Sequence, residues 1–230
     1  MSAFDTYTDI DGLFKFNNIS KRTRRHLSEV YMVLSFLVGS CAVGSFLNIA
    51  YGIGSRLTGL MGLFCILYIA FSQEKSMTRL AALIGFGLLE GMSIGPLINA
   101  AIQIDPSLIL TAFVASLGIF VCFSVAALLS DQRAFMYLGA ILGSLTTILM
   151  LFSLLYLFGV RSEFFFHVNL YLSLFVFMGY IIYDTQLIVY RSEHGARDVY
   201  VDALNLFIDL VAVFVRILII LMEKKEKKKD

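Results

Sequence analysis

The chain has 230 residues, of which 59% are hydrophobic and only 15% charged, and its mean hydropathy is +0.83. Soluble domains have about 45–50% apolar and about 25% charged residues, so this composition indicates a membrane protein with several spans. The formal net charge of +1 excludes the strong basic field that attracts nucleic acid, and the expected surroundings are a lipid bilayer.

Residues 1–29 are polar, and we expect them to form an exposed, partly disordered cytoplasmic segment. They lack the apolar stretch and small-residue site of a cleaved signal, so the first apolar run is expected to act as an uncleaved signal. A basic cluster stands just before that run: Lys21, Arg22, Arg24 and Arg25. Such a cluster is typical of a topology signal, and binding of anionic lipid is the alternative.

Seven apolar runs follow, separated by linkers of a few residues. They cover residues 30–51, 54–72, 80–102, 108–129, 134–158, 164–190 and 201–222. Each is close to the ~20 residues that cross the hydrocarbon core, although the second is short. The chain is therefore predicted to be an all-α polytopic membrane bundle of six to seven helices over 30–222, with a Lys-rich tail over 223–230 and no soluble domain.

Lysine and arginine residues predict the orientation of the bundle, because they are enriched in cytoplasmic loops. Ten fall on the side of the N-terminus: Lys15, Lys21, Arg22, Arg24, Arg25, Lys75, Arg79, Arg133, Arg191 and Arg197. The opposite loops hold two, Arg56 and Arg161, so we predict a cytoplasmic N-terminus. Lysines of the tail favour a last helix that re-enters without crossing, whereas its 22-residue length favours crossing; we expect re-entry.

The third run combines a stripe of glycines with an acid. Gly87, Gly91 and Gly95 recur at every fourth position, which lets a neighbouring helix approach closely. Pro96 is expected to kink or end the regular helix. Glu90 lies near the middle of this run and is a candidate for an ion pathway; a protonated carboxyl group or a pair with a basic group are the alternatives.

Two carboxylates interrupt the last two runs. Asp184 lies six residues before the end of one run, and Asp209 lies about eight residues into the next. Both are therefore ~9–12 Å from the same linker, and two antiparallel helices can hold them at one depth. An ionised aspartate in a membrane costs roughly 2.5–3.5 kcal/mol, so such residues face the interior and suggest an ion or proton pathway. A shared hydrogen bond that only fixes the packing is the alternative.

Four polar residues of the last run share one helix face: Asp202, Asn205, Asp209 and Arg216. Lipid offers these groups no hydrogen-bond partners, so the face is predicted to turn inward.

No catalytic constellation occurs in the sequence. Three cysteines lie inside apolar runs and are expected to be small buried side chains: Cys41, Cys65 and Cys122. Three histidines lie near span ends and are expected to be interfacial or loop residues: His26, His167 and His194. The Gly-x-Gly-Asp arrangement of intramembrane aspartyl proteases is absent at both central aspartates. We therefore expect no enzymatic activity, no metal site and no cofactor.

Several segments together resemble one family. Gly85-Phe-Gly-Leu-Leu-Glu-Gly91-Met-Ser-Ile-Gly95-Pro96-Leu-Ile98, followed by Asp105-Pro106-Ser-Leu-Ile-Leu-Thr111-Ala112-Phe113, is similar to the signature of the Bax inhibitor-1, or transmembrane Bax inhibitor motif, family. Tyr183-Asp184-Thr185-Gln186-Leu187-Ile188, Glu193-His194-Gly195 and Leu206-Phe207-Ile208-Asp209 match its C-terminal pattern. The resemblance covers nearly the whole chain from residue 20 onward.

This resemblance implies two three-helix layers around a central C-terminal helix. It also implies a pH-sensitive calcium leak in the endoplasmic reticulum membrane that lowers store calcium and suppresses apoptosis, with calcium as the transported ion. The paired aspartates of the family fall on Asp184 and Asp209, and a basic residue near the start of the third span falls on Arg79, a candidate latch. Bcl-2-family and endoplasmic reticulum stress proteins are the implied partners. The alternative is a non-conducting membrane protein that modulates cell-death and stress-signalling partners.

Two positions depart from the family pattern. Glu90 stands where a small polar or apolar residue is expected, and this acid adds a third titratable group to the pathway. Asn205 stands where some relatives have another acid, which is expected to blunt acid sensing.

Overall fold

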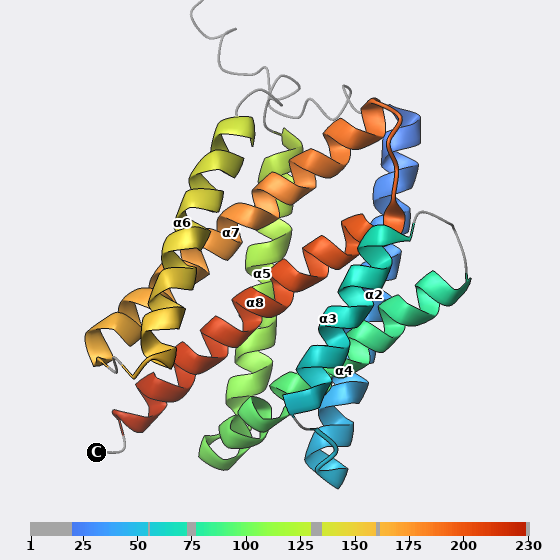
Figure 1. Ribbon diagram of the computed structural model, residues 1–230. Helices are drawn as coiled ribbons and strands as arrows, with labels where there is room; N and C mark the ends of the chain where they lie inside the picture. The colour runs from blue at the N-terminus through green and yellow to red at the C-terminus, as the bar shows by residue number, and fades with distance from the viewer. Residues whose placement is uncertain (1–19, 55, 73–76, 130–134, 160–161, 229–230) are drawn as a thin grey trace, which may run out of the picture.

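The computed structural model describes residues 20–54, 56–72, 77–129, 135–159 and 162–228, and these ranges contain seven α-helices and no strand (Figure 1). The helices are α2 (Lys21–Tyr51), α3 (Arg56–Phe71), α4 (Met77–Ile104), α5 (Ser107–Leu129), α6 (Phe135–Leu157), α7 (Glu163–Glu193) and α8 (Val199–Glu226). Six are long and apolar enough to cross a membrane, whereas α3 has only 16 residues. The predicted all-α polytopic bundle is thereby confirmed.

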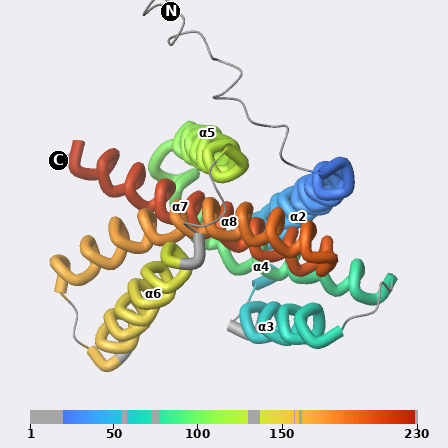
Figure 2. Tube along the Cα trace, turned by 90° about the horizontal axis from the view of Figure 1, so that it is seen from above, coloured from blue at the N-terminus to red at the C-terminus, as the bar shows by residue number. Residues whose placement is uncertain are grey.

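Helix α8 is the centre of this bundle. On one side of the bundle α4 packs against both α2 and α3, and on the other side α7 packs against both α5 and α6. Helix α8 passes between them and contacts members of both (Figure 2). Half of its most apolar stretch is buried, more than in any other spanning helix of the described chain. The predicted arrangement of two three-helix layers around a central C-terminal helix is confirmed.

The first helix begins before the first apolar run. The Oγ atom of Ser20 accepts a hydrogen bond from the backbone N–H of Thr23 at 3.2 Å, which caps α2. Thr23, His26 and Leu27 are buried, so residues 21–29 belong to the bundle and are not part of an exposed segment. Residues 1–19, the remainder of the predicted polar segment, lie outside the described residues.

The glycine stripe of α4 faces α2. A Cβ atom at Gly91 would overlap the backbone carbonyl of Cys41, and one at Gly44 of α2 would overlap the carbonyl of Leu88. Gly87 and Gly95 likewise lie against α2, so the stripe sets how closely these two helices approach.

Pro96 does not end α4, which continues to Ile104. The extensive packing of α4 against α2 and α3 stabilises the helix beyond the one backbone hydrogen bond that proline removes. Of the two expectations for Pro96, an end of the regular helix is therefore wrong, and a kink stays a prediction.

Large apolar side chains cover the outside of the bundle, as a bilayer requires. Phe64 and Phe71 of α3 are 70% and 83% exposed, and Phe36 of α2 is 66% exposed. Cys122 of α5 is also exposed, so it was wrongly expected to be buried within the protein, whereas Cys41 is buried. A cysteine behaves as a small apolar side chain, so contact with lipid is as favourable for it as burial in a protein core.

Helix α8 traverses the whole bundle. We call the end that carries Lys21 the near end and the opposite end the far end. At the near end, Asp202 of α8 hydrogen-bonds His26 of α2. At the far end, Nζ of Lys225 lies 2.8 Å from Oδ2 of Asp105 in the α4–α5 linker. This ammonium group and the N–H of Ser107 hold the pKa of Asp105 well below its usual range.

The re-entry of the last helix stays a prediction, and the structure favours the alternative of crossing. Helix α8 has 28 residues, about 42 Å of continuous helix, and apolar neighbours along its length. The charge of the tail lysines still favours the cytoplasmic side.

The cytoplasmic position of the N-terminus stays a prediction, and several of the charges that support it (Lys15, Lys75, Arg133, Arg161) lie outside the described residues. A cysteine introduced at Ser2 is expected to react with a membrane-impermeant reagent only from the cytoplasmic side. If α8 crosses, a tag after Asp230 is expected on the opposite side, and if it re-enters, the tag is expected on the cytoplasmic side. The unsubstituted chain provides the background from the native cysteines, and labelling of both ends from one side would contradict a crossing α8.

Candidate functional site

Asp184 and Asp209 meet at the interface between α7 and α8. Their carboxyl groups lie close enough to each other to interact directly. Asp209 is only 4% exposed, and its Oδ2 atom has no hydrogen-bond partner in the part of the chain that the structure describes. The structure thus brings together the two aspartates that the sequence places at one depth, and leaves one carboxyl oxygen unsatisfied inside the bundle.

A second buried acid lies toward the near end of the same helix. Nε2 of His26 and Oδ2 of Asp202 are 2.8 Å apart, and both side chains are 3% exposed. Nη1 of Arg191 on α7 lies 3.7 Å from the other oxygen of Asp202. Because Asp202 stands two helical turns before Asp209, these groups continue the polar face of α8 from the aspartate pair to the near end of the bundle.

The prediction that His26 is an interfacial or loop residue is wrong. His26 belongs to the buried face of α2, which includes Thr23, Val30, Leu34 and Leu37 at spacings of three and four residues. That periodicity is visible in the sequence and indicates an inward position. His194 does lie in a loop, as the cap of α7, where it is exposed.

Arg79 is buried at the near end and joins three helices. Its Nε and Nη2 atoms donate to the carbonyl of Ile69 in α3 at 3.1 and 2.8 Å, and Nη2 donates to Oδ2 of Asp198 at 2.6 Å. Oδ1 of Asp198 also accepts from the N–H groups of Tyr200 and Val201, so this aspartate caps α8. Arg79 therefore holds the start of α8, eleven residues before Asp209, and Asp198 is a partner that the sequence interpretation missed.

Glu90 and Arg216 line a separate cavity. It has a volume of about 420 Å³ and lies between α3, α4 and α8. Arg216 donates to Oγ of Ser173 at 2.7 Å and to the carbonyl of Ala212 at 2.8 Å, and its guanidinium group lies 4.3 Å from the ring of Phe177. The predicted polar face of α8 thus divides, because Asp202 and Asp209 lie at the aspartate site and Arg216 lies at this cavity.

Asn205 is half-buried between Asp202 and Asp209 on α8. An amide at this position adds hydrogen-bonding capacity to the polar face without adding a charge.

The aspartate pair suits a proton or a passing cation. A resident calcium ion takes six to eight oxygen ligands, and two carboxyl groups supply too few. Among the described residues, no group of three or more His, Cys, Asp or Glu side chains gathers in a metal-binding arrangement. Two carboxyl groups in contact repel each other when both are ionised.

Comparisons with known proteins agree on one family. The family described as "Inhibitor of apoptosis-promoting Bax1" matches residues 23–226. The proteins named Bax inhibitor 1 from Rattus norvegicus and Homo sapiens are each 35% identical over 236 residues, covering 100% of this chain and 99% of their own length. The Bax inhibitor 1 of Oryza sativa subsp. japonica is 40% identical over 233 residues, covering 96% of this chain and 92% of its own.

Proposed function

Because this chain belongs to the Bax inhibitor-1 family, we propose that it is a pH-sensitive calcium leak of the endoplasmic reticulum membrane that lowers store calcium and suppresses apoptosis. The observation that carries the proposal is the buried contact between Asp184 and Asp209 at the central helix. Carboxyl groups inside a membrane bundle are costly, and they mark ion and proton pathways in membrane proteins.

The proposed mechanism begins with one proton shared by Asp184 and Asp209 in the closed state. Loss of this proton leaves two negative charges in contact in a medium of low dielectric constant. Their repulsion loosens α7 from α8 and offers two carboxylates to a cation. The pair titrates as a unit, so its apparent pKa values belong to neither residue alone.

The near-end groups extend this pathway toward the solvent. His26, Asp202 and Arg191 lie between the near end of the bundle and the aspartate pair. Asp202 supplies a further carboxylate on the same face of α8, and Arg191 offsets its charge while the pathway is closed.

Calcium flux through the purified protein tests the proposal. Liposomes that hold a calcium indicator are expected to admit calcium when they contain the protein, at a rate that depends on pH, whereas protein-free liposomes stay tight. The absence of flux at every pH would support the second candidate, a non-conducting membrane protein that acts through Bcl-2-family or stress-signalling partners. The relatives of this chain are named as inhibitors of Bax, and that name is the observation in favour of the non-conducting candidate.

If the cavity beside α8 is part of the ion pathway, replacing Glu90 by glutamine is expected to change calcium flux by several-fold while leaving the thermal stability similar. The side chain lines a cavity rather than a packed interface, so the isosteric change leaves the packing intact. The measurement is the flux-against-pH curve in liposomes, with Glu193→Gln at the end of α7 as the matched control. A curve identical to that of the wild type would remove Glu90 from the pathway.

A further inference from the structure

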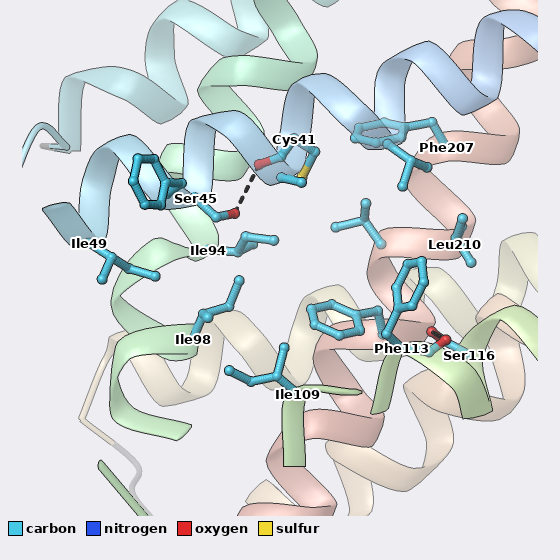
Figure 3. Close-up of a pocket in the computed structure, with 15 residues that line it drawn as sticks. Cys41, Ser45, Ile49, Ile94, Ile98, Ile109, Phe113, Ser116, Phe207 and Leu210 are labelled. Carbon is cyan, nitrogen blue, oxygen red and sulfur yellow. Dashed lines mark hydrogen bonds between the residues drawn. The ribbon is translucent and has the colours of Figure 1, made fainter. Parts of the chain in front are cut away.

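A long groove runs between α2 and α5 with α8 as its floor. Two adjoining cavities form it, of about 310 and 470 Å³, and both are lined by Val38, Phe113 and Leu210. Figure 3 shows the far-end cavity, with Phe113 of α5 opposite Ile94 and Ile98 of α4. The groove opens sideways to the surrounding lipid, because side chains that line it are themselves exposed: Phe46 by 65% and Val121 by 51%.

The lining of the groove is apolar along almost its whole length. Three of its serine hydroxyl groups donate to the backbone of their own helices: Ser35 to Tyr31, Ser45 to Cys41 and Ser116 to Phe113, each at 2.9 Å. A fourth, Ser124, accepts a hydrogen bond from Thr185 of α7 at 3.5 Å. Figure 3 shows the bond from Ser45 as a dashed line. With these donors occupied, the surface that a ligand meets is apolar, as the acyl chain of a lipid requires.

Basic residues lie on the groove face of α2 beyond the near end of the groove, by the spacing of the helix. The groove positions of α2 include Tyr31, Ser35, Val38, Ala42, Ser45 and Ile49, at spacings of three and four residues. The same spacing, extended toward the N-terminus, leads to Arg24 and then to Lys21. Arg24 is two turns, about 10 Å, before Tyr31. Arg22 and Arg25, although equally exposed, lie on other faces of the helix.

We propose that this groove binds one phospholipid of the near leaflet that has an anionic headgroup. The phosphate and its net negative charge lie at Lys21 and Arg24, and one acyl chain runs past Tyr31 into the groove between α2 and α5. Juxtamembrane basic residues attract anionic lipid by themselves, and the adjoining apolar groove adds selectivity for a lipid over a free anion. This site is separate from the aspartate pair and does not rest on the proposed function.

The charge half of the proposal is tested by native mass spectrometry of the purified protein. The probes are phosphatidylserine and phosphatidylcholine with identical acyl chains, added in detergent. The wild type is expected to retain phosphatidylserine roughly 25-fold more than phosphatidylcholine, because each of the two basic side chains contributes roughly a fivefold preference. Lys21→Gln with Arg24→Gln is expected to abolish this preference. Arg22→Gln with Arg25→Gln removes the same charge from other faces and is expected to keep it.

Equal losses in the two double variants would show diffuse attraction by the whole basic cluster and would overturn the site. Absence of a preference in the wild type would overturn it as well.

Binding of the acyl chain in the apolar groove is tested by Ser35→Phe. This change places a large side chain in the groove and is expected to reduce retention of phosphatidylserine at least several-fold. Val43→Phe adds the same ring to an exposed position of α2 outside the groove and is expected to change nothing. If Ser35→Phe does not fold, the two charge variants still decide the proposal.

Discussion

Replacing Asp209 by asparagine is expected to flatten the pH dependence of calcium flux. In the proposed mechanism, one proton shared with Asp184 controls the separation of α7 from α8, so flux is expected to rise with pH by up to about tenfold per unit, the limit for a single titrating proton. An amide at position 209 cannot lose that proton near neutral pH, and the repulsion that opens the pathway never develops. The measurement is the initial rate of calcium entry into liposomes between pH 5 and 8.

Combining Asp184→Asn with Asp209→Asn tests the shared proton more directly than either change alone. Asp184→Asn is expected to flatten the curve as Asp209→Asn does, and the two changes together are expected to add little, because either one removes the shared proton. Asp105→Asn is the matched control, since it removes a carboxylate at the far-end linker, and it is expected to keep the pH dependence. Additive effects of the two central variants would show that the residues titrate independently, contrary to the shared-proton mechanism.

The fold follows closely from local properties of the sequence. Apolar runs of about 20 residues predict spanning helices because a backbone in lipid must satisfy its own hydrogen bonds. The glycine stripe correctly indicates a close helix contact, although it does not say which helix is the partner; the structure identifies α2, with Gly44 as the reciprocal position. Whether the last helix crosses or re-enters could not be predicted from its own residues. The charge of its tail favours re-entry, whereas the burial of its whole length favours crossing.

The contact between two site residues was predictable where both lie at a known number of residues from the same linker. Asp184 and Asp209 flank the same short connection, so their depths are tied together by helix geometry. His26 and Asp202 are 176 positions apart, and their contact depends on how α2 packs against α8, which no local pattern specifies. Asp198 was missed for a related reason: it lies just outside the apolar run, in a position where a solvated helix cap is the ordinary expectation.

Arg79→Met is expected to cause the largest loss of stability among single substitutions outside the pathway. Arg79 is 2% exposed, and its guanidinium group is the donor to both the end of α3 and the cap of α8. A methionine fills similar space but leaves the Ile69 carbonyl and one Asp198 oxygen without this donor. Leaving the buried Ile69 carbonyl without a donor costs about 1–3 kcal/mol, and the partly exposed Asp198 adds less, which corresponds to a fall in Tm on the order of 5 °C for a chain of this size.

The measurement is thermal unfolding in detergent, followed by the loss of the monodisperse peak in size-exclusion chromatography. Arg22→Met, which replaces an exposed arginine at the near end, is the matched control and is expected to leave Tm within a degree or two of the wild type.

Arg79→Lys is expected to recover only part of the loss, because an ammonium group cannot reproduce the planar contact with Ile69 and Asp198 together. Asp198→Asn is expected to cost less, since Asp198 is 38% exposed and its amide oxygen can still cap α8. If Arg79→Met melts with the wild type, the start of α8 is held by the contact of Asp202 with His26 rather than by Arg79.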